Sequence, residues 1–161
     1  MVPFIDGMLE GSSDRTVIVD CTSQAKWWTD RAQMDAARNL IVQDARGLSR
    51  VPKLFDRKIR LGFCCRLDYH PREEEIQPGR PGGLFDSVFL DANYFTPEKL
   101  EQTLKLALEI GDGYILFWNY RANWWLNSVD ARPADGAALS RLSRWVPPVY
   151  WRALERAKAG E

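Results

Sequence analysis

The sequence has few of the residues that build metal sites and disulfide frameworks. It contains one histidine, His70, and three cysteines, of which Cys64 and Cys65 are adjacent. Because structural zinc sites use spaced pairs of cysteine or histidine, this supply predicts neither a metal site nor another cofactor. The odd cysteine count favours reduced, packed thiols, and Cys21 has no histidine near it in sequence to act as a base.

An excess of charge of either sign is also missing. The chain has 22 Lys and Arg residues against 22 Asp and Glu residues, and no Lys/Arg run is longer than two. This balance removes a global attraction to nucleic acid or to an anionic membrane, so we expect neither partner. No window approaches the roughly 18 consecutive apolar residues of a spanning helix. Residues 1–7 lack the basic and apolar regions of a signal peptide, so we expect a cytoplasmic protein.

Tryptophan, in contrast, is abundant. Seven of 161 residues are tryptophan, and four of the seven form the adjacent pairs Trp27–Trp28 and Trp124–Trp125. One interpretation is packing in the core and at interfaces. The other is a platform on which sugar rings stack, and it applies best where tryptophan follows the end of a strand, as Trp124 and Trp125 do.

The hydrophobic pattern alternates between short apolar runs and helical periodicity. It predicts strands at 16–20, 59–68 and 114–119 and helices at 4–10, 29–47, 97–110 and from Pro147-Pro148 onward. Loops are expected around Pro52 and over residues 70–83. Residues 84–90 fit either a short strand or a helical turn. Thr29 and Thr96 are the expected N-caps, and Ser140 is a candidate cap. Strands that alternate with helices favour parallel pairing. We therefore predict one α/β domain over residues 1–161, with a small, mostly parallel sheet and flanking helices.

The richest local pattern is the strand that follows Gly113. Asn119, Tyr120, Trp124 and Trp125 come just after its end. In α/β proteins, ligands lie at the loops that follow the C-terminal ends of strands. Amides bond hydroxyl groups and flat aromatic rings stack on C–H faces, so these residues predict a binding site for a sugar-like ligand.

Two carboxylates occupy similar positions on the other strands. Asp20 ends the first predicted strand, and Asp68 ends the second, with Tyr69 beside it. Each aspartate is a candidate nucleophile, general acid/base or hydroxyl ligand, and Tyr69 is a candidate substrate contact. The alternatives are a cap or loop hydrogen bond, or an ion pair with Arg66 inside the second strand.

Several segments together resemble a known class of protein. They are Phe4-Ile-Asp-Gly-Met-Leu-Glu, Val19-Asp20, Leu61-Gly-Phe with Leu67-Asp-Tyr, Phe95-Thr-Pro-Glu-Lys-Leu-Glu, Gly113-Tyr-Ile-Leu-Phe-Trp and Asn123-Trp-Trp. They resemble the C-terminal half of uncharacterised TIM-barrel proteins of the glycoside-hydrolase-like type. The resemblance implies that the three strands are the last strands of a (β/α)₈ barrel and that Asp20 and Asp68 catalyse hydrolysis of a carbohydrate.

The chain departs from that pattern in two ways. A whole barrel needs about 250 residues, and the third strand continues as Asn119-Tyr120-Arg121, where the relatives tend to place an acidic residue. A missing N-terminal half or a homo-oligomer would then complete the core, and we expect self-association of the isolated chain. The second hypothesis is a non-catalytic domain that binds a glycan or only packs within a larger protein. A hydrolase needs two carboxyls about 5 to 10 Å apart in one cleft, and this requirement separates the two.

Overall fold

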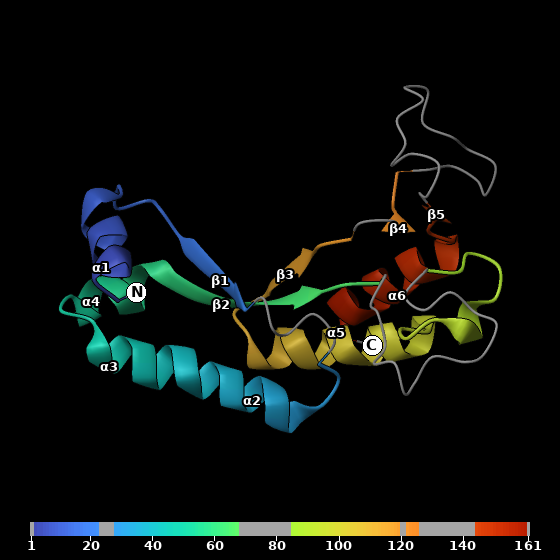
Figure 1. Cartoon of the computed structure of the whole chain (residues 1–161), viewed down its shortest axis with the longest axis horizontal. Coiled ribbons are helices and arrows are strands. Elements are labelled where there is room, and N and C mark those ends of the chain that lie inside the picture. The colour runs from blue at the N-terminus through green and yellow to red at the C-terminus, as the bar shows by residue number, and fades with distance from the viewer. Residues whose placement is uncertain (1, 23–27, 68–84, 120–121, 126–143, 161) are drawn as a thin grey trace. The chain divides into compact units, whose positions relative to one another are not determined.

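A computed structural model describes residues 2–22, 28–67, 85–119, 122–125 and 144–160 of the chain (Figure 1). The fold is α/β, and the chain divides into two compact units, one of residues 1–64 with 106–116 and one of residues 65–105 with 117–161. The single domain expected over residues 1–161 stays a prediction. The elements are α1 (Val2–Gly11), β1 (Ile18–Thr22), α2 (Arg31–Asn39), the π-helical η2 (Leu40–Ala45), α3 (Arg46–Leu48), α4 (Pro52–Lys58), β2 (Ile59–Cys65), the 3₁₀-helical η4 (Leu90–Ala92), α5 (Pro97–Ile110), β3 (Tyr114–Phe117), β4 (Ala122–Asn123), β5 (Arg144–Trp145) and α6 (Pro148–Ala159).

The three predicted strands form one open sheet in the order β1-β2-β3. β1 runs parallel to β2, with Ile18 opposite Ile59 and Thr22 opposite Phe63. On the other side of β2, the N–H of Asp112 donates to the carbonyl of Leu61 (2.9 Å) and the N–H of Trp118 donates to that of Cys65 (3.1 Å). Residue numbers rise in the same direction along both strands between these two bonds, so β3 is parallel to β2 as well. The predicted parallel sheet is therefore confirmed.

One face of this sheet builds the core of the first unit. Leu61 and Phe63 are buried, and Ile115 of β3 packs against the same cluster. The cluster is completed by helical residues, which are Leu9 of α1, Met34 and Ala37 of α2, Ile41 of η2, Phe55 of α4, and Ala107 and Ile110 of α5. In Figure 1, α2 and the C-terminal end of α5 lie along one side of β2. This apolar layer accounts for the helical periodicity of the sequence.

Gly111 follows the last residue of α5, and the packing explains why a glycine is needed there. A Cβ atom at this position would lie 2.9 Å from the carbonyl oxygen of Ala107 and 3.1 Å from that of Leu61. The N–H of Gly111 donates to Ala107, and the next N–H, that of Asp112, crosses to β2. A side chain at this corner would therefore push the helix away from the strand that it covers.

Helix starts agree with the sequence in part. At α5, Oγ1 of Thr96 accepts the N–H of Lys99 (3.2 Å), which confirms the predicted cap. At α2, the cap is Asp30, whose Oδ1 accepts the N–H of Gln33 (2.9 Å), so the expectation of Thr29 was wrong by one residue. A carboxylate at this position also complements the partial positive charge of the helix N-terminus.

Two segments between the predicted elements differ from expectation. The loop predicted around Pro52 is the first turn of α4, where proline fits because its missing N–H has no partner to lose. Residues 85–89 form neither the strand nor the helical turn considered for 84–90, and a 3₁₀ turn starts at Leu90. There the carboxylate of Asp86 accepts the N–H groups of Val88 and Phe89, each at 2.8 Å, and this local bonding competes with a strand.

Lys58 caps the end of α1 from inside the first unit. Its Nζ is buried and donates to the carbonyls of Leu9 (2.7 Å) and Ser12 (2.9 Å) and to the hydroxyl of Ser12 (3.0 Å). The two carbonyl oxygens lie at the end of the helix, where backbone carbonyls have no backbone donors within the helix. The hydrogen bonds of Lys58 therefore give its buried ammonium group three acceptors and give the carbonyl groups at the end of α1 a donor.

The second unit packs α6 on the N-terminal part of α5. Tyr150 is fully buried, and its hydroxyl donates to the carbonyl of Phe95 (2.7 Å) and accepts the amide of Asn93 (3.1 Å). Glu101 of α5 bonds Arg156 of α6 (2.7 Å) and Lys105 (2.9 Å). The predicted start of the last helix at Pro147-Pro148 is confirmed, with Pro148 as the first residue of α6.

Candidate functional site

An aromatic cluster lies in the second unit at the position where the sequence predicts a sugar site. This tryptophan cluster consists of Phe117, Trp124, Trp125 and Trp151. Local pairing positions it: β4 runs parallel to β5 with Asn123 opposite Trp145, and the carbonyl of Asn123 accepts the N–H of Val146 (3.3 Å). This pairing holds the Asn-Trp-Trp segment next to the start of α6, which carries Trp151.

The two adjacent tryptophans have different environments. Trp124 is half-buried and packs edge-to-face on Phe117 (ring centroids 5.3 Å apart) and on Trp151 (4.9 Å). Trp125 is 83% exposed, and its ring is tilted against that of Trp151 at a centroid distance of 6.3 Å. One ring of the pair therefore packs, and the other is exposed to solvent.

Asparagines hold the backbone around this cluster. The Oδ1 of Asn123 accepts the N–H of Trp125 (2.9 Å), which fixes the turn that presents the exposed ring. The Oδ1 of Asn119 accepts the N–H of Leu67 (2.7 Å), so this side chain extends the pairing of β2 with β3 by one bond. The side-chain amide of Asn119, which the sequence predicts to bond a sugar hydroxyl, therefore already accepts a hydrogen bond from the backbone.

Trp124 also carries a polar atom that its packing does not satisfy. Its Nε1 is buried and has no hydrogen-bond acceptor within the described part of the chain. A buried donor without an acceptor costs about 1–3 kcal/mol. The position is therefore explained by the packing of its ring and not by its N–H group.

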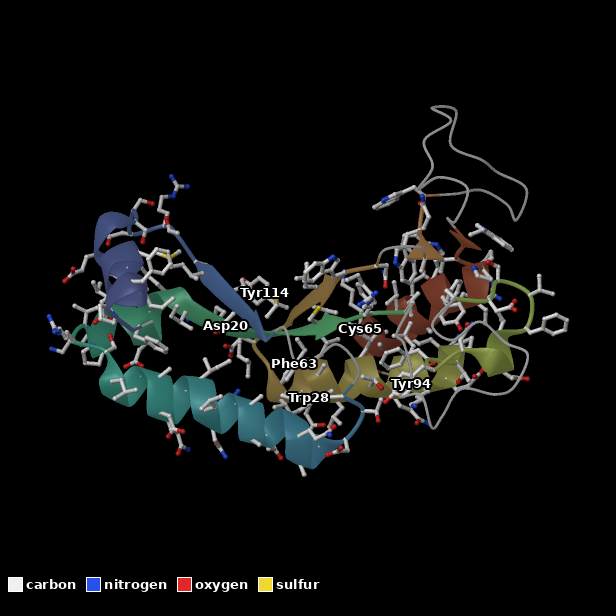
Figure 2. The ribbon with its side chains drawn as sticks, viewed as in Figure 1. Asp20, Trp28, Phe63, Cys65, Tyr94 and Tyr114 are labelled. Carbon is white, nitrogen blue, oxygen red and sulfur yellow. The ribbon has the colours of Figure 1, made fainter. Side chains whose placement is uncertain are left out.

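Asp20 lies in the first unit, in the middle of β1. It is paired with Leu61, and paired residues of parallel strands point to the same face of a sheet, which here is the face covered by helices. Asp20 as a whole residue is exposed to solvent. Nevertheless, the surrounding protein partly desolvates its carboxyl group, and this raises the pKa of that group. Figure 2 labels Asp20 together with Phe63 and Trp28, which belong to the core or pack against it.

Asp20 and Asn119 belong to different units of the chain. Asp20 pairs with Leu61 in the first unit, whereas Asn119 bonds Leu67 in the second. Their predicted common site therefore stays a prediction. Asp68, Tyr69 and Tyr120 lie outside the described residues, and their predicted roles stay predictions.

Cys21 is held as a packed thiol. Its Sγ would lie 2.6 Å from a Cβ added to Gly62, so the missing side chain of Gly62 makes room for it. Burial, helped by Cys64 and the charge of Asp20, raises the pKa of the Cys21 thiol, which keeps it protonated at neutral pH. The three cysteines form no disulfide in the described structure. Among the described residues no cluster of His, Cys, Asp or Glu is suited to a metal ion, and none of the helices is long and apolar enough to span a membrane.

Trp151 was not singled out from the sequence, although it contacts both tryptophans of the predicted site. Its signal was present, because it lies in the first turn of a helix whose start at Pro148 was predicted. Comparisons of the chain with protein-family models, with curated proteins and with solved structures found no match. The candidate site therefore rests on its own geometry.

Proposed function

We propose that this chain binds a carbohydrate on the exposed face of the tryptophan cluster. The observation that carries the proposal is the 83% exposure of Trp125, on a segment whose backbone is fixed by Asn123 and backed by Trp151. A large apolar ring held in water loses contact with solvent when a sugar's C–H face covers it. Because the ring is held in place before binding, little conformational freedom is lost when a ligand stacks on it.

Trp151 extends the surface beyond one ring. It is 38% exposed and lies beside Trp125 at a tilt of 56°. Two exposed rings at an angle suit consecutive residues of a twisted or bent glycan chain better than one flat monosaccharide. We therefore expect affinity to rise from mono- to oligosaccharides.

Affinity electrophoresis with soluble polysaccharides and titration with cello-, xylo-, chito- and malto-oligosaccharides test the proposal. The intact chain is expected to bind at least one of these series, and Trp125→Ala to abolish binding. Phe89→Ala is the matched control, because Phe89 is an exposed aromatic residue of the same unit outside the cluster. No binding to any series, or equal binding by Trp125→Ala and the intact chain, would refute the proposal.

Hydrolysis is a second candidate function, favoured by one observation. Desolvation raises the pKa of the Asp20 carboxyl group above its usual value, which is the direction of shift that a general acid in a glycosidase requires. Release of reducing ends from the same substrates, abolished by Asp20→Asn, is the expected result for a hydrolase. Binding without such release, or release that Asp20→Asn leaves intact, would remove Asp20 from catalysis.

A further inference from the structure

Asn123 holds the backbone beside the tryptophan cluster and carries a side-chain amide of fixed orientation. Its backbone carbonyl accepts the N–H of Val146 (3.3 Å), within the pairing of β4 with β5. Its side-chain Oδ1 accepts the N–H of Trp125 (2.9 Å). Because a backbone N–H can only donate, this bond identifies which end of the amide is the oxygen. All three residues belong to the second unit.

The end of the amide that remains for a ligand is Nδ2, which carries two N–H donors and no acceptor. The same side chain fixes the turn that presents the ring of Trp125, and that ring is 83% exposed. Asn123 is itself partly exposed. An exposed aromatic ring next to a fixed donor suits a ligand that combines an apolar group with an acceptor oxygen.

An N-acetyl group on a sugar ring has both of these features. Its carbonyl oxygen can accept an amide–carbonyl hydrogen bond from Nδ2. Its methyl group is apolar and is removed from water when it lies on an indole ring. A hydroxyl group in its place offers no apolar surface and is a donor as well as an acceptor. This chemistry separates N-acetylated sugars from sugars that carry only hydroxyl groups.

We infer that Asn123 determines the specificity of the tryptophan cluster and that the glycan bound there contains N-acetylhexosamine. The inference rests on the proposed carbohydrate binding and narrows it to one class of ligand. The sugar stacks on Trp125, and its acetamido carbonyl accepts a hydrogen bond from Nδ2 of Asn123. The asparagine then has two separable roles, since Oδ1 holds the turn and Nδ2 binds the ligand.

Titration with matched oligosaccharides tests the class of ligand. Chito- and cello-oligosaccharides share one backbone and linkage, and they differ at one ring position, which carries an acetamido group in the first series and a hydroxyl in the second. The intact chain is expected to bind the chito series about tenfold more tightly, as one net hydrogen bond gives. Deacetylated chito-oligosaccharides, which carry an amino donor in place of the acceptor, are expected to lose this advantage.

The two proposals fail in different ways in this titration. Binding of the cello or deacetylated series as tightly as the chito series would overturn the inference and leave carbohydrate binding standing. Binding of no series at all would refute the proposed function itself.

The variant Asn123→Asp tests the residue. It keeps an oxygen for the N–H of Trp125 and replaces the donor by a carboxylate oxygen, so thermal melting should match that of the intact chain. Affinity for the chito series is expected to fall about tenfold, to the level of the cello series. Gln102→Glu is the matched control, because it makes the same amide-to-carboxylate change at an exposed residue of α5 in the same unit. An unchanged preference for the chito series in Asn123→Asp, or an equal loss of both series, would overturn the inference.

Discussion

The core of the first unit and the tryptophan cluster of the second use apolar side chains in opposite ways. Around Leu61 and Phe63, apolar residues of helices and strands exclude water, and Gly62 and Gly111 allow close approach of neighbouring atoms. In the tryptophan cluster, Trp124 is half-buried while Trp125 is exposed. Within the described residues, the tryptophan cluster is therefore less closed to water than the core of the first unit.

The largest expected effect comes from emptying the first core. Leu61 is fully buried, and Leu61→Ala should lower the free energy of unfolding by about 3–5 kcal/mol, because it leaves a cavity between β2 and the helices. Urea denaturation measures the change. The same truncation at an exposed residue, Leu48→Ala, should change the free energy of unfolding by less than about 0.5 kcal/mol. Similar losses for both variants would show that the first core is not closed as described.

Overfilling the same core should cost somewhat less. Gly111→Ala places a Cβ against two carbonyl oxygens and should destabilise by about 1–3 kcal/mol. Gly47→Ala is the matched control, because nothing lies within 4 Å of its Cβ position, and a helical glycine replaced by alanine should be neutral or stabilising by up to about 1 kcal/mol. Thermal melting of both variants decides whether the α5–β2 approach is as close as the structure has it.

In the second unit, a buried hydroxyl should give stability a pH dependence. Burial raises the pKa of Tyr150 above its ordinary value near 10. The stabilisation is therefore fully present below that ordinary pKa and is lost progressively as the pH rises above it, because the unfolded tyrosine ionises first. Unfolding of the intact chain and of Tyr150→Phe between pH 8 and pH 11 should show a slope that the variant reduces. Parallel slopes would contradict the burial of this group.

The smallest expected effect concerns Trp124. Trp124→Phe keeps an aromatic ring against Phe117 and Trp151 and removes the buried N–H that has no acceptor in the described structure. The loss of ring volume and the removal of the donor oppose each other, so the net change should stay below about 1 kcal/mol. Denaturation of Trp124→Leu, which loses the ring altogether, provides the comparison and should cost more.

The sequence predicts the architecture better than the site. Apolar runs, the Thr96–Pro97 start and Gly111 locate β3 and α5, because periodicity and caps are local properties. The seven-residue α4 was missed, since a helix this short offers too few turns for a periodic pattern. At the site, the sequence locates Trp124 and Trp125 after the end of a strand, but their partner Trp151 comes from a helix more than 20 residues away in sequence. The face to which Asp20 points depends on its pairing with Leu61, which no local pattern contains.

The central claim is that Trp124 supports the tryptophan cluster and Trp125 is the ligand-binding ring. Oligosaccharide titration and thermal melting of Trp124→Ala and Trp125→Ala, side by side, test it most directly. Trp125→Ala should melt like the intact chain, within about 0.5 kcal/mol, and lose binding, whereas Trp124→Ala should cost about 3 kcal/mol of stability. If both variants lose stability and neither changes binding, the pair is structural and the carbohydrate proposal fails.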